Sequence, residues 1–141
     1  MTIMNSLTKP QKVASYLVSF AAALILLQTL FFKFTGASES IYIFTKVGLE
    51  PWGRYGSGVV ELIAAVLLMS SCYGWAGALL ALGVMGGAIL SHLTVLGIVV
   101  QNDGGLLFGM AIAVVICCVV TLVLHRGRIP FIAPWFKARN V

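Results

Sequence analysis

Charge is scarce in this chain. Of its 141 residues only 9% are charged and only four are acidic, whereas 60% are hydrophobic. Soluble domains carry about 25% charged and roughly 45–50% apolar residues, so this chain has too few charges to cover the surface of a soluble globule. The composition therefore excludes a soluble enzyme and a disordered segment. The mean hydropathy of +1.05 indicates an integral membrane protein.

Cysteine and metal-ligand patterns are equally scarce. The three cysteines are Cys72, Cys117 and Cys118, and none belongs to a C-x-x-C pair. Neighbours in sequence rarely meet disulfide geometry, so a disulfide-stapled domain is excluded and we expect the cysteines to be structural. No H-E-x-x-H, phosphate loop or other ligand spacing occurs, and we therefore expect no metal site and no covalently bound cofactor.

Long apolar runs dominate what is present. A helix that crosses the hydrocarbon core needs about 20 mostly apolar residues. Four runs qualify, at residues 13–32, 57–73, 76–100 and 106–124. The first is longer than the roughly 7–15 apolar residues of a secretory signal, so we interpret it as a retained helix. The sequence predicts an all-α fold, an integral membrane bundle of four transmembrane helices forming a single domain over residues 1–141.

The long first connection, residues 33–56, carries signals for one more helix. Ser38 is a typical helix start, and Gly48 followed by Pro51 is a typical stop. Apolar side chains recur three residues apart between 41 and 47. This pattern predicts a short amphipathic helix that lies in the membrane interface, in the first outer loop.

The basic residues predict the orientation of the bundle. One end collects most of them: Lys9, Lys12, Arg126, Arg128, Lys137 and Arg139. The other end has three: Lys33, Lys46 and Arg54. Short loops rich in Lys and Arg stay in the cytoplasm, so both termini should be cytoplasmic, with a basic tail over 125–141. The formal net charge of +5 is then an orientation signal, and we expect no nucleic-acid partner.

Small residues recur at helical spacing in the last two apolar runs. Membrane helices associate through close backbone approach, which small side chains permit. The two stripes contain Gly83 and Gly87 in one run and Gly105, Gly109 and Ala113 in the other. We expect both stripes to pack inside the bundle.

Ionisable groups within a membrane span are costly and usually have a partner. Lys33 ends the first run, Gln28 lies about 7 Å deeper, and Glu61 and His92 lie in the second and third runs. The topology places all four in the outer half of the bilayer, where Asn102 and Asp103 cap the same side.

Three interpretations of this polar cluster stay open. In the first, Lys33 and Glu61 form a structural ion pair, and Gln28 or His92 satisfies the remaining hydrogen bonds. In the second, the cluster is a pocket in which a carboxylate and an imidazole bind a quinone headgroup or relay a proton. The third is a pathway for a small substrate or ion.

Several short motifs occur in a recognisable order. They span residues 32–36 (FKFTG), 47–51 (VGLEP), 60–62 (VEL), 88–93 (AILSHL) and 104–105 (GG). This order resembles the DoxX family of small four-helix bacterial membrane proteins. The resemblance implies an inner-membrane location and places the family's recurrent polar positions on Lys33, Glu61 and His92. The chain departs from the family's G-L-P by the insertion of Glu50.

The DoxX family takes its name from a subunit of a thiosulfate:quinone oxidoreductase, and other members are described as parts of membrane oxidoreductase assemblies. The resemblance therefore implies a small accessory subunit of a redox assembly, with quinone as a candidate ligand and other membrane subunits or further copies of itself as partners. The chain is not expected to be catalytic alone. The rival is a scaffold without a ligand. A carrier of a small solute or lipid ranks last, because no inverted repeat or broken helix is evident.

Overall fold

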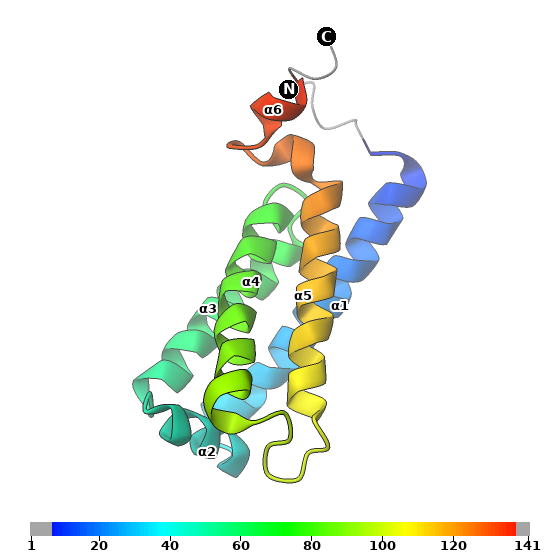
Figure 1. Cartoon of the computed structure of the whole chain (residues 1–141). Coiled ribbons are helices and arrows are strands. Elements are labelled where there is room, and N and C mark those ends of the chain that lie inside the picture. The colour runs from blue at the N-terminus through cyan, green and yellow to red at the C-terminus, as the bar shows by residue number, and fades with distance from the viewer. Residues whose placement is uncertain (1–6, 138–141) are drawn as a thin grey trace.

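The protein is a bundle of four long helices in the computed structural model, which describes residues 7–137 (Figure 1). The long helices are α1 (Lys9–Thr35), α3 (Trp52–Met69), α4 (Gly74–Ser91) and α5 (Leu106–Leu124). Shorter elements are α2 (Ser38–Val47), the π-helical turn η1 (His92–Leu96), the 3₁₀ turn η2 (Arg126–Arg128) and α6 (Ala133–Lys137). No strand occurs in this part of the chain. The predicted all-α fold is confirmed.

Four segments are long and apolar enough to cross a membrane, the third being α4 continued by η1. The four are packed so that α1 contacts α3 and α5, and α4 contacts the same two helices. Small side chains line the centre and let the helices approach closely. The most deeply buried apolar residues are Ala22, Ala23, Leu26, Ala64, Ala65, Leu68, Ala78, Ala81, Val114 and Cys118.

The helix boundaries coincide with the predicted span for α5 and differ from the predicted spans for α1, α3 and α4. α1 begins earlier than predicted, where the Gln11 side chain accepts a hydrogen bond from the Thr8 backbone N–H. α3 lies about five residues N-terminal to its predicted span, because the segment from Trp52 onward is helical despite its polar residues. Hydropathy alone does not predict such helical turns at the edge of an apolar run.

The third predicted span, 76–100, is also wrong at its end. The α-helix stops at Ser91, and after η1 the chain enters a loop at Gly97, with φ 80° and ψ 170°. Essentially only glycine adopts this conformation, so Gly97 ends the helical segment. The apolar residues that follow it, up to the buried Val100, belong to a loop.

The short helix predicted in the first connection is confirmed as α2. It begins at Ser38 and ends at Gly48, whose left-handed φ of 78° closes the helix. α2 contacts α1, α3 and η1. It therefore crosses the end of the bundle opposite the two termini (Figure 1).

The stripes predicted in α4 and α5 do not pack inside the bundle. Gly83, Gly87 and Gly109 are exposed, and a Cβ at any of them would meet no atom within 4 Å. Gly105 and Ala113 are half-buried, and Gly105 precedes α5 with a left-handed φ of 84°. The buried faces lie one or two residues away, through Gly77, Ala78 and Ala81 in α4 and through Ala111, Val114 and Cys118 in α5. Because nearly every residue of these helices is small or apolar, composition does not show which face turns inward.

Candidate functional site

Lys33 and Glu61 form a buried ion pair between α1 and α3. The Lys33 Nζ lies 2.5 Å from the Glu61 Oε1, and the two side chains are 14% and 1% exposed. The other carboxylate oxygen, Oε2, lies 3.1 Å from the Thr29 hydroxyl, whose one proton it shares with the Leu26 carbonyl oxygen at 2.8 Å. Thr29 precedes Lys33 by four residues, so one face of α1 presents both donors. Each Glu61 oxygen thus has a donor in place.

A second ion pair lies next to the first. Arg54, in the first turns of α3, is buried, and its Nε donates to both carboxylate oxygens of Glu50 at 2.9 and 3.0 Å. Its Nη1 donates to the backbone carbonyl of Lys33. That carbonyl lies in the last turn of α1, where helix carbonyls lack intrahelical partners. Arg54 therefore ties the end of α1 to the start of α3.

α2 covers the outer side of this cluster. The Lys33 Nζ lies 5.6 Å from the centre of the Phe44 ring, a distance at which a cation is attracted to an aromatic face. The Arg54 guanidinium lies 4.4 Å from the centre of the Tyr55 ring. The Tyr55 ring in turn stacks on Phe34 with centroids 6.2 Å apart. Aromatic rings thus limit the access of water to both cations.

His92 is buried but makes its hydrogen bond elsewhere. Its Nδ1 lies 2.8 Å from the carbonyl oxygen of Gly97. Because a carbonyl only accepts, Nδ1 must carry the proton. The ring also meets Phe108 edge to face, with centroids 5.5 Å apart. Within residues 7–137 no hydrogen bond joins His92 to Glu61 or Lys33, so the imidazole holds η1 against the following loop.

Asp103 organises the loop before α5. Its Oδ1 accepts hydrogen bonds from the backbone N–H groups of Val100 and Gly105, and its Oδ2 accepts one from Leu107. Burial works to raise the pKa of this carboxyl, but the three N–H donors and the nearby His92 outweigh it and lower the pKa below its ordinary value. Asn102 is exposed, with a left-handed φ of 66°. This pair shapes the loop and does not reach the Lys33–Glu61 pair with any hydrogen bond in the described chain.

Gln28 does not join the cluster. It is exposed on the outer face of α1 and makes no hydrogen bond within the described residues. Thr29, the next residue, takes the place that we expected Gln28 to fill. Arg54, which the sequence marks only as a loop charge, belongs to the cluster as well. The spacing of four residues between Glu50 and Arg54 was the available signal for their pairing.

The cluster is chemically well satisfied. The ion pairs are matched in charge, and among residues 7–137 no buried side-chain nitrogen or oxygen lacks a hydrogen-bond partner. Nor does this part of the chain hold any group of three or more His, Cys, Asp or Glu side chains that could bind a metal ion. What the arrangement does best is join α1, α2 and α3 at one end of the bundle. Lys33 retains N–H donors beyond the one that it gives to Glu61.

The chain matches no protein-family model, no curated protein and no solved structure.

Proposed function

We propose that the chain is a small, non-catalytic interaction subunit of a larger membrane assembly. The observation that carries this proposal is a glycine face on the outside of α4, made of Gly83, Gly86 and Gly87. All three are exposed, and a Cβ on any of them would meet nothing within 4 Å. Gly83 and Gly87 are spaced as G-x-x-x-G, the pattern through which membrane helices approach one another closely.

This glycine face is unexplained by the fold of the single chain. A glycine inside a helix costs about 1 kcal/mol relative to alanine, and these three glycines give no close packing in return within the described bundle. Contact with a helix of another subunit would supply that compensation. The partner is either another membrane protein or a second copy of this chain.

The Lys33–Glu61 pair supports the non-catalytic part of the proposal. A general acid or base needs a carboxylate that substrate or water can reach. Glu61 is 1% exposed, and Lys33 and Thr29 already donate to its two oxygens. A structural ion pair that fixes the position of α1 against α3 accounts for this geometry.

A second candidate function is contact with a quinone, as the resemblance to the DoxX family implies. One observation favours it: the Lys33 side chain is 14% exposed, and its ammonium has N–H donors left for a carbonyl oxygen. In this version the chain is an accessory subunit of a quinone-linked oxidoreductase in the bacterial inner membrane. Both termini would be cytoplasmic, so the quinone would lie in the outer half of the bilayer.

Bulky substitutions on the glycine face test the leading proposal. We expect Gly83→Leu combined with Gly87→Leu to abolish co-purification of stoichiometric subunits, or self-association, in mild detergent. The matched control is Ala21→Leu, because Ala21 is a small exposed residue on α1. The control should leave the assembly intact, and both variants should keep the stability of the monomer. An assembly that survives the double substitution would contradict the proposal.

A further inference from the structure

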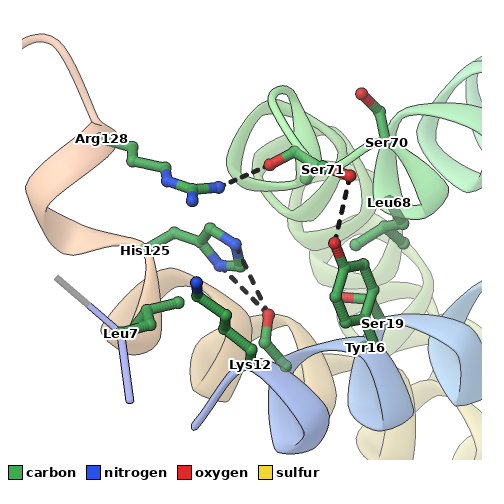
Figure 2. Close-up of a pocket in the computed structure, with 11 residues that line it drawn as sticks. Leu7, Lys12, Tyr16, Ser19, Leu68, Ser70, Ser71, His125 and Arg128 are labelled. Carbon is green, nitrogen blue, oxygen red and sulfur yellow. Dashed lines mark hydrogen bonds between the residues drawn. The ribbon is translucent and has the colours of Figure 1, made fainter. Parts of the chain in front are cut away.

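A basic pocket lies where α1 begins and α5 ends, and Figure 2 shows the side chains that line it. Its volume is about 200 Å³. Three segments form it: the start of α1, the turn between α3 and α4, and the chain that leaves α5. The residues that line it are Leu7, Lys12, Ser15, Tyr16, Ser19, Leu68, Ser70, Ser71, Gly74, His125 and Arg128.

The lining is rich in donors and holds no acid. Two cations, Lys12 and Arg128, share the pocket with the hydroxyls of four serines and Tyr16. The four acidic residues of the whole chain are Glu39, Glu50, Glu61 and Asp103. They lie on α2, in the turn between α2 and α3, in the middle of α3, and in the loop before α5. The pocket therefore has no acidic side chain of this chain to balance its charge.

The Lys12 side chain is half-buried, and within residues 7–137 it makes no hydrogen bond or ion pair. By contrast, the Arg128 Nη1 donates to the Ser71 carbonyl at 2.5 Å, and the Tyr16 hydroxyl lies 3.1 Å from the Ser71 hydroxyl. These two contacts hold the rim of the pocket in place. The remaining N–H groups of Arg128 stay available to a ligand.

His125 closes the pocket floor in its neutral form. The ring is 7% exposed, and its Nδ1 donates to the Thr121 carbonyl at 2.9 Å. Burial, and then the neighbouring Arg128 charge, lower the pKa of His125 below its ordinary value, against the opposing effect of that hydrogen bond. At neutral pH the positive charge of the pocket therefore comes from Lys12 and Arg128. The N-terminus of α4, at Gly74, adds a favourable dipole for an anion.

We propose that this basic pocket binds a phosphate group. An ammonium, a guanidinium and several hydroxyls around one small cavity match an anion that offers several acceptor oxygens. The end of a bundle is also where a membrane protein meets phospholipid headgroups, and basic pockets between membrane helices are a known kind of headgroup site. The site is separate from the glycine face and from the Lys33–Glu61 pair, so it does not depend on the proposed function.

Ligand-induced stabilisation tests the proposal, because a ligand that binds the folded state raises its thermal midpoint. The protein in dodecyl maltoside, which contains no phosphate, is titrated with phosphatidylglycerol in one arm and with inorganic phosphate in the other. Sodium chloride at equal ionic strength is the reference. We expect saturable stabilisation above the reference. Stabilisation by the lipid alone would identify a lipid headgroup, and stabilisation by phosphate would identify a soluble phosphate source.

Lys12→Met and Lys9→Met form the matched pair of variants. Both remove one positive charge from the start of α1, but Lys9 is exposed and lies outside the pocket. Because the Lys12 side chain makes no hydrogen bond or ion pair to the described chain, replacing it should leave the fold intact. We expect Lys12→Met to raise the Kd about tenfold, as loss of a charged hydrogen bond does, and Lys9→Met to change it by less than about twofold. The proposal is overturned if neither probe stabilises the protein, or if the two variants weaken binding equally.

Discussion

At the scale of single residues, Glu61 is the most deeply buried charged residue of the described chain. A buried carboxylate needs both a counter-charge and hydrogen bonds, and Lys33 and Thr29 supply them. We expect Lys33→Met to lower the free energy of unfolding by about 3–5 kcal/mol, because it leaves the charge of Glu61 buried without its cation. Unfolding in mixed micelles with increasing denaturing detergent measures this loss.

The double variant Lys33→Met with Glu61→Leu supplies the control. It removes both charges, so its loss of stability should be smaller than that of Lys33→Met alone. A larger loss in the double variant would mean that the pair itself, and not the stranded charge, stabilises the bundle.

Quinone content after purification separates the two candidate functions. A structural pair leaves that content unchanged in every folded variant, whereas a quinone site loses its ligand when Lys33 is replaced.

The partners of these residues show how far sequence reasoning reaches. The free-energy cost of a charge within an apolar run is enough to single out Glu61 and Lys33, because such a charge must be neutralised. The structure pairs these two residues. The same reasoning does not distinguish Gln28 from Thr29, since adjacent residues on a helix point in directions about 100° apart. It also does not place His92, whose partner lies in a loop that hydropathy mistakes for helix.

At the scale of helices, α3 and α4 pack closely against each other at Gly77. A Cβ added at Gly77 would lie 2.5 Å from the Leu68 backbone nitrogen and 2.7 Å from the Ala64 carbonyl oxygen. We expect Gly77→Ala to force the helices apart and to lower the free energy of unfolding by about 1–3 kcal/mol, as overpacking does. The same detergent titration measures the effect.

Gly83→Ala is the matched change on the same helix. Its Cβ would enter open space, so the variant should gain up to about 1 kcal/mol from the better helix propensity of alanine. Equal destabilisation by both variants would contradict the assignment of Gly77 to the inner face and Gly83 to the outer face.

The sequence predicts that α4 is a membrane helix, because length and apolarity decide that. It does not predict which glycines turn inward, because both faces consist of small and apolar residues.

At the scale of the whole molecule, charge is divided between the two ends of the bundle. The end formed by α2 and the loop before α5 carries all the acidic side chains outside the spans. The end with the basic pocket carries none. Exposed tryptophans also mark the two ends, with Trp52 at the start of α3 81% exposed and Trp135 in α6 80% exposed. Tryptophan favours the headgroup level on both sides of a bilayer, so their positions fit a bundle that spans the membrane.

The orientation of that bundle is the last prediction. The excess of Lys and Arg predicts that the termini and the turn between α3 and α4 lie in the cytoplasm. Cys72 is exposed in that turn, whereas Cys117 and Cys118 lie within α5. A membrane-impermeant maleimide should therefore label Cys72 only after the cells are permeabilised, and Cys72→Ser should abolish this labelling. In the Cys72→Ser background, a cysteine introduced as Val99→Cys, at an exposed position in the opposite loop, should be labelled in intact cells. The reverse pattern would place the termini outside and turn the basic pocket toward the outer leaflet.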